Sequence, residues 1–264
     1  MKVYLKILPA FLALGCCMPM ACKKAESQTE KIGVVTPPVI SKPEAKLLPL
    51  QMGTGKSKMT FSYTSGLALS KIDYGDGTSS VLEFTATGSP SLLTHALGNE
   101  IVAYTQFKLD NSGRVIKGSS YTIAGNKDVF AGMFSVTYQS DSKISEISHY
   151  DSKQILLSTD KKIYADNGNL IMEQGVAGVV SANYSYDDKN GLFKNVGFAW
   201  LFAIEEQNML FLSGLNNISS CGYPLKSLNN QSFSYTYNED GYPESVKFPV
   251  NGVATSYKVS YKVL

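Results

Sequence analysis

The sequence predicts an all-β protein: a long antiparallel up-and-down meander that curls into a barrel-like sheet, with one short helix around residues 199–213. Aromatic and polar side chains alternate along many segments after residue 56, and turn signals built from Asp or Asn and Gly recur between these segments. Alternation with a period of two is typical of strands that bury one face. The composition agrees, because charged residues make up 17% of the chain, below the roughly 25% of an average domain.

The N-terminal segment, residues 1–21, is expected to be a lipoprotein signal peptide. It begins with two basic residues, Lys2 and Lys6, and continues as an apolar run broken by Pro9 and Pro19. Such a run is too short and too interrupted to span a bilayer, which needs roughly 20 apolar residues. We therefore expect export of the chain followed by cleavage.

Cys22, which follows this segment, is the predicted site of lipid attachment. Ala21-Cys22-Lys23-Lys24 places a small residue before the cysteine and polar residues after it. This resembles the cleavage site of bacterial lipoproteins, and the Cys-Lys-Lys start is similar to that of lipoproteins of the Bacteroidetes type. Pro19 departs from the leucine-like residue that the pattern prefers, and Cys16 and Cys17 are alternative sites. An ordinary secretory signal with incidental cysteines is the other interpretation.

Residues 22–55 are predicted to be the lipid-attachment cysteine followed by a disordered tether. The segment is rich in Lys, Glu, Pro, Ser, Gln and Thr and poor in aromatic residues. Such a composition cannot bury enough apolar surface to offset the entropy lost on ordering. We expect it to space the β domain, residues 56–264, from the membrane.

The alternation is clearest in two segments near the C-terminus. Phe233, Tyr235 and Tyr237 alternate with hydroxyl-bearing residues, and from Tyr257 onward Tyr or Val alternates with Ser or Lys. In a strand this pattern gives one apolar face and one wet face. Such runs predict about 11 to 14 strands in the β domain.

Hairpin turns are predicted where an aromatic or apolar residue is followed by Asp or Asn, polar residues and Gly. The Asp or Asn side chain can bond the turn backbone, and Gly supplies a positive φ. A further copy, Tyr138–Ser142, lacks the glycine. The complete copies are Tyr74–Gly77, Leu109–Gly113, Tyr164–Gly168, Tyr186–Gly191 and Tyr237–Gly241.

The predicted helix lies where the alternation stops. Residues 198–212 are apolar at both ends, contain the only tryptophan and are rich in helix-forming residues, and Gly214 follows where a helix would end. We expect this helix to cover an open end or face of the sheet and to bury Trp200, Phe202 and Phe211.

One hairpin carries a resemblance to a known family. The segment from Tyr235 to Pro243, followed by a second alternating strand, resembles the tyrosine-aspartate (YD) hairpin repeat. The layout of residues 56–264 is similar to that of uncharacterised Bacteroidetes-type lipoproteins whose β domain is described as porin-like. The resemblance implies a barrel-like meander that stays outside the bilayer, and it supplies no catalytic residues.

No catalytic residue is predicted. Gly55-Lys56-Ser57 matches the end of a phosphate-binding loop, but the first glycine of that motif would fall at Leu50. No Gly-x-Ser-x-Gly elbow occurs. Paired carboxylates in a cleft would allow acid and base chemistry. Glu205-Glu206 lies in the segment that lacks alternation, and the sequence brings no pair together among the other candidates near strands, which are Glu83, Glu100, Glu146 and Glu173. We therefore expect a protein that is not an enzyme.

No cofactor or metal is expected either. His95 and His149 are far apart, and the chain has no closely spaced Cys pair after the signal. Asp187, Asp188 and Asn190 could offer oxygens to calcium, but the same residues satisfy a turn, which is the favoured interpretation. Cys221 would be the only cysteine of the processed chain, and we expect it to be a small buried residue rather than a nucleophile.

The charge excludes nucleic acid as a partner. Without residues 1–21 the chain has 22 basic and 22 acidic residues, since two of its 24 basic residues lie in the signal. Arg114 is the single arginine, so the forked groups that bind phosphate backbones are almost absent.

We therefore expect a non-enzymatic binding module of the cell envelope, held at the outer membrane by acyl chains inserted in lipid. Exposed tyrosines among Ser, Thr and Asn suit a glycan or an envelope protein as the further partner. The alternatives are a hydrolase acting on an envelope or dietary polymer, a purely structural envelope protein, and a membrane-spanning β-barrel. The sequence identifies no ligand-facing residues.

Overall fold

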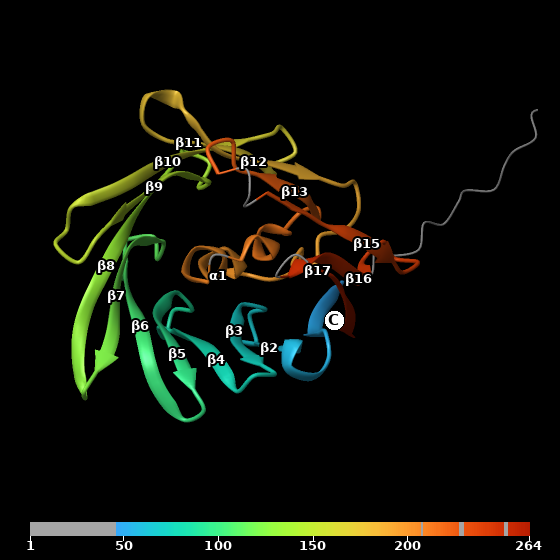
Figure 1. The fold of residues 1–264 in the computed structure, drawn as a ribbon, viewed down its shortest axis with the longest axis horizontal. Coiled ribbons are helices and arrows are strands. Elements are labelled where there is room, and N and C mark those ends of the chain that lie inside the picture. Colours follow the sequence, from blue (N-terminus) through green and yellow to red (C-terminus); the bar gives the residue numbers. More distant parts are fainter. Residues whose placement is uncertain (1–45, 207, 227–229, 251–252) are drawn as a thin grey trace, which may run out of the picture. The chain divides into compact units, whose positions relative to one another are not determined.

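The alternating sequence forms 17 antiparallel strands in the part of the chain that the computed structural model describes (Figure 1). The described residues are 46–264, apart from 207, 227–229 and 251–252. The predicted signal peptide, Cys22 with its alternatives Cys16 and Cys17, and most of the tether lie outside them.

The elements follow one another as an almost uninterrupted run of strands. The strands are β1 (Leu47–Met52), β2 (Met59–Tyr63), β3 (Leu69–Tyr74), β4 (Thr78–Phe84), β5 (Pro90–Leu97), β6 (Glu100–Leu109), β7 (Val115–Ala124), β8 (Lys127–Tyr138), β9 (Ile144–Tyr150), β10 (Leu156–Tyr164), β11 (Leu170–Gln174), β12 (Val180–Tyr186), β13 (Ile218–Gly222), β14 (Gln231–Ser232), β15 (Ser234–Tyr237), β16 (Pro243–Val250) and β17 (Val253–Val263). The helices are α1 (Ala199–Glu205) and the 3₁₀ turns η1 (Gly55–Ser57), η2 (Val176–Gly178) and η3 (Met209–Leu212).

The sheet nearly closes into a barrel. Each strand from β1 to β13 pairs with the next, and β15, β16 and β17 continue the series. β14 and β15 flank Phe233, and they pair with β13 and β16 respectively. β17 also pairs with β1, the first strand of the series. The predicted fold class, an antiparallel meander curled into a barrel-like sheet, is therefore confirmed.

The recurring turn signals form hairpins as predicted, with one exception. In the hairpins that carry this signal, the Asp or Asn side chain accepts the N–H two residues later, for example Asp110 from Ser112 at 2.9 Å and Asn238 from Asp240 at 3.1 Å. The copy without glycine works because Ser142 itself adopts a positive φ of 67°. The exception is Tyr186–Gly191, which ends β12 but starts no new strand.

Instead, the chain leaves the wall after β12 and crosses the interior of the barrel. We call residues 187–217 the plug; they contain α1 and η3 and return to the wall at β13. Figure 1 shows α1 within the ring of strands. Asp187 does bond the Lys189 N–H at 3.1 Å, as in the hairpins. Its other bonds to Asn217, at the far end of the plug, are what direct the chain inward.

The predicted helix is confirmed in position but is shorter than expected. The α-helix ends at Glu205, and η3 forms the remaining apolar stretch. Phe202 and Phe211 are buried, with 0% and 3% of their surface exposed, as predicted. Trp200 is only partly buried, and the helix lies inside the barrel rather than over an open end.

The predicted domain boundary at residue 56 is wrong, because the fold begins earlier. β1 lies within the expected tether and pairs with both β17 and β2. Leu47, Leu48 and Met52 bury their side chains in the core. Pro49 lies next to an irregularity in the register of β1 with β17, a setting in which strands tolerate proline. The strand is held by distant partners that local composition does not reveal.

The core lies between the plug and the inner face of β2–β5. Phe61, Ile72 and Leu93 contribute from the wall, each at most 3% exposed. Phe193 of the plug meets Phe61 edge to face, with ring centroids 5.6 Å apart. Phe193 also contacts Phe211 at 5.0 Å. This dense aromatic packing fixes the plug against one side of the barrel. In residues 46–264, leaving out the gaps given above, no helix has the length and apolarity needed to cross a bilayer.

Candidate functional site

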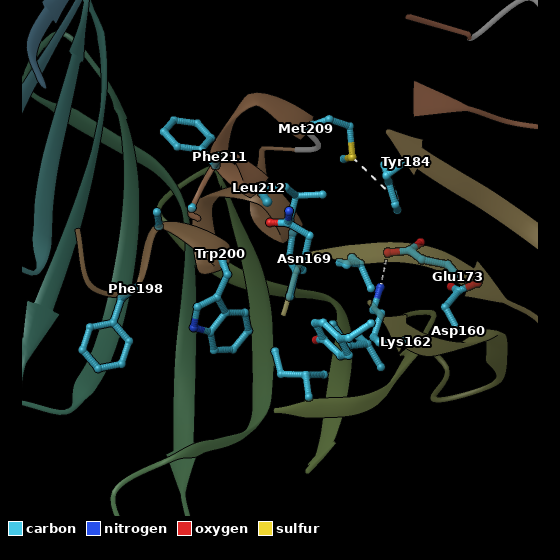
Figure 2. Close-up of a pocket in the computed structure, with 18 of the residues that line it drawn as sticks. Asp160, Lys162, Asn169, Glu173, Tyr184, Phe198, Trp200, Met209, Phe211 and Leu212 are labelled. Carbon is cyan, nitrogen blue, oxygen red and sulfur yellow. Dashed lines mark hydrogen bonds and ion pairs between the residues drawn. The ribbon is translucent and has the colours of Figure 1, made fainter. Parts of the chain in front are cut away.

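The plug leaves a cavity of about 1760 Å³ on the other side of the barrel, partly open to solvent. Its wall is the inner face of β7–β12, and its floor is the plug (Figure 2). The two halves of the lumen differ in chemistry, since β2–β5 present apolar side chains whereas β9–β11 present several polar and charged ones. The cavity lies in the half of the lumen that carries the charged side chains.

The sequence of β10 explains this wall. Ser158, Asp160 and Lys162 share the inward face, because they alternate with residues on the outer face. Most strands of the barrel place apolar residues inside, but β10 has polar residues on both faces over this stretch. A strand with two polar faces is the signal that could have located the cavity from the sequence.

An ion pair lies on this wall. Lys162 of β10 and Glu173 of β11 are direct partners in the register, and the Lys162 Nζ bonds Glu173 Oε1. Their side chains are only 11% and 17% exposed. Removing each ion from water costs several kcal/mol, so such a pair adds little to stability. Its presence beside an open cavity therefore suggests a role in binding.

Asp160 lies beside this pair. Its Oδ1 accepts a hydrogen bond from the Ser181 hydroxyl at 2.7 Å, and its Oδ2 accepts one from the Ser158 hydroxyl at 3.3 Å. His149 is opposite Ser158 in the register of β9 and β10. Burial lowers the pKa of His149, with the Asp160 charge acting in the opposite direction. The imidazole is therefore mainly neutral at pH 7.

Aromatic side chains face this wall from the plug. Figure 2 shows Trp200 and Phe198 directed away from the plug ribbon, with Trp200 on the side toward Lys162. Phe198 caps the start of α1 with a left-handed φ of 61°. A bulky residue seldom adopts this conformation, and such strain occurs at functional sites. Tyr184 lies across the cavity, where its hydroxyl contacts Met209 Sδ at 3.8 Å.

A second polar cluster joins the end of α1 to the opposite wall. The Thr105 hydroxyl of β6 donates to Glu205 Oε2 at 2.8 Å, and the Tyr74 hydroxyl of β3 donates to Glu206. Burial, which outweighs the Thr105 hydrogen bond and is reinforced by the Glu206 charge, raises the pKa of Glu205 to about 7. Burial likewise raises the pKa of Glu206. Neither carboxylate lines the cavity, so this cluster attaches the plug rather than forming part of the site.

The other residues singled out in the sequence are structural. Cys221 is 1% exposed, and burial raises its pKa to about 11, so it remains a thiol. His95 lies on a different wall from His149 and bonds the Ser80 hydroxyl at 2.9 Å. Gly55–Ser57 forms a 3₁₀ turn instead of a phosphate-binding loop.

The suggested calcium ligands are used within the protein. Asp187 binds Asn217, Lys189 and Tyr237, and Asn190 Oδ1 accepts a hydrogen bond from Lys194 Nζ at 2.8 Å. Across the described ranges no group of three His, Cys, Asp or Glu residues is placed to hold a metal ion. The favoured interpretation of this segment as a turn therefore agrees with its hydrogen bonds.

The chain matches no protein-family model and no curated protein sequence. A porin-like protein from Bacteroides uniformis is 13% identical, with 83% of this chain and 97% of that chain covered at a TM-score of 0.47. A porin-like protein from Bacteroides vulgatus is 14% identical, with 82% and 99% covered at 0.48. TcdB2-TccC3 without its hypervariable C-terminal region is 13% identical, with 78% and 10% covered at 0.29. At these identities and TM-scores, the likenesses assign neither a family nor a function.

Proposed function

We propose that the chain is a non-enzymatic binding protein of the cell envelope, and that its lumen cavity holds part of a glycan. The observation that carries this proposal is the inward-facing group of Asp160, Lys162 and Glu173 opposite Trp200 across an unfilled cavity. A barrel that needed only stability would place apolar residues at these positions, as it does on β2–β5.

The mixed lining suits a saccharide better than an apolar ligand. Sugar hydroxyls both donate and accept, so they can bond the Asp160 carboxylate and the hydroxyls around it at the same time. The apolar C–H face of a sugar ring can pack on an indole such as that of Trp200. The cavity of about 1760 Å³ exceeds the roughly 300–1,000 Å³ of a typical small-molecule site. It therefore has room for several sugar units.

Replacing Trp200 with alanine is expected to weaken glycan binding about tenfold or more, because the ring contact and its buried area are lost. Calorimetry with purified full-length chain and a panel of neutral, acidic and amino oligosaccharides measures this. Tyr104→Ala is the matched control, since Tyr104 stacks on Tyr121 at 4.9 Å and does not line the cavity. If Trp200→Ala binds every saccharide as tightly as Tyr104→Ala does, the saccharide site lies outside the cavity.

A hydrolase acting on an envelope or dietary polymer is the second candidate, because two carboxylates, Asp160 and Glu173, line one cavity. Incubating the bound oligosaccharide with the protein and separating the products distinguishes the two. The binding proposal expects full recovery of the intact oligosaccharide. Shorter products whose release stops in Asp160→Asn would favour the hydrolase.

The location in the envelope rests on Cys22. Metabolic labelling with palmitate is expected to mark the wild-type chain and to be lost in Cys22→Ala, which should then be released from membranes. Two acyl chains hold a protein at a bilayer durably, and the variant without them lacks this attachment. Cys17→Ala is the control and should keep the label. Label retained in Cys22→Ala would instead move the anchor to Cys16 or Cys17.

A further inference from the structure

The charge of the cavity wall restricts the kind of glycan that fits. Asp160 and Glu173 each carry a negative charge and Lys162 a positive one, while burial keeps His149 mainly neutral. Among these three side chains of β10 and β11, one negative charge is therefore in excess. Lys162 is committed to Glu173, so the unbalanced charge is that of Asp160.

Asp160 has no cationic partner among the described residues. Both its hydrogen bonds come from neutral hydroxyls, those of Ser158 and Ser181. A carboxylate has about four acceptor positions, so each oxygen can accept a further bond. Two further cations line the cavity, and neither is bonded to Asp160: Arg114 pairs with Asp110 at 2.8 Å, and Lys226 is exposed to solvent.

An anionic ligand would add to this unbalanced charge, and a neutral one would leave it uncompensated. A protonated amine would neutralise it through a charge-assisted hydrogen bond, which is about twice as strong as a neutral one. The aromatic face of Trp200 remains available for the sugar ring itself.

Resting on the proposed function, we infer that the glycan carries a free amino group, and that the ammonium of an amino sugar binds Asp160 while its ring packs on Trp200. N-acetylation removes the charge from this nitrogen and adds bulk. The cavity should therefore distinguish an amino sugar from its acetylated form.

The test compares glucosamine oligomers with N-acetylglucosamine oligomers of the same length, titrated into the full-length chain. Trp200 is the only tryptophan, so its fluorescence reports on the cavity alone. We expect the free-amine oligomer to bind about tenfold tighter or more, and this advantage to shrink as salt is raised. Equal or tighter binding of the acetylated oligomer would overturn the inference and leave the proposed function standing. Binding of neither oligomer would overturn both.

Variants of Asp160 assign the preference to that residue. Asp160→Asn should lose most of the advantage of the free amine and keep its affinity for the acetylated oligomer, whereas Asp160→Glu should keep the preference because it keeps the charge. Asp188→Asn removes the same charge from a side chain that is 86% exposed and outside the cavity, and should change nothing. An undiminished preference in Asp160→Asn would overturn the role of Asp160. If the asparagine variant fails to fold, the salt dependence of the free-amine preference still tests for a charged contact, and a preference that does not shrink with salt would overturn the inference.

Discussion

Replacing Asn217 with alanine is expected to lower the free energy of unfolding by about 3–5 kcal/mol, because it leaves several buried groups without partners. Asn217 is fully buried and joins the two ends of the plug. Its Oδ1 accepts the Leu192 N–H at 2.8 Å, and its Nδ2 donates to the Asn190 carbonyl at 2.9 Å and to Asp187 at 3.2 Å. Alanine removes all three bonds. Urea unfolding followed by circular dichroism measures the loss.

The adjacent residue provides the control for this prediction. Asn216 is partly exposed and makes two comparable side-chain bonds, to Lys189 at 2.8 Å and from Asn169 at 2.9 Å. Water can replace them, so Asn216→Ala should cost only about 1 kcal/mol. Equal costs for the two variants would contradict the view that Asn217 fastens the plug.

Replacing Glu205 with glutamine is expected to remove a pH-dependent contribution to the free energy of unfolding on the order of 3 kcal/mol. The pKa of Glu205 is raised to about 7 in the folded protein, so the folded state binds this proton more tightly than the unfolded state does. Protonated Glu205 therefore stabilises the folded state. This contribution is complete at a pH below the ordinary carboxyl pKa and is lost as the pH rises through about 7. Above that, wild type should be less stable than Glu205→Gln.

Comparison of the two proteins isolates this residue. Burial lowers the pKa of His95 and of His149, and their contribution to stability is lost as the pH falls. Both histidines are present in wild type and in Glu205→Gln, so their effect cancels in the difference between the two stability curves. A difference that stays constant between about pH 4 and pH 8 would show that Glu205 titrates normally.

The sequence predicts the sheet well because its signals are local. Alternation identifies the strands, and Asp or Asn with Gly identifies the hairpins between them. The same turn signal at Tyr186–Gly191 gives a wrong hairpin, because the bonds from Asp187 to Asn217 connect residues 30 positions apart. β1 is missed for a similar reason, since β17 and β2 hold it.

The cavity is harder to predict because it depends on which face of each strand points inward. Where a strand has one apolar face, burial of that face determines which side points inward. Around Asp160, β10 has polar residues on both faces, so alternation alone does not show which face lines the lumen. The unfilled space also depends on where the plug packs. The sequence identifies Trp200 as exceptional, but its partial exposure follows only from the path of the plug. The likeness to the YD repeat, the lipid anchor and the absence of catalysis stay predictions.

The most direct measurement of the central claim, that the lumen cavity is the glycan site, is the nuclear magnetic resonance signal of the single indole N–H during titration. With Trp200 as the only tryptophan, this signal has one possible source in the chain. We expect it to shift saturably on addition of glucosamine oligomers, with the same Kd as calorimetry. A signal that stays in place while calorimetry detects binding would contradict the claim, because the glycan would then occupy another surface.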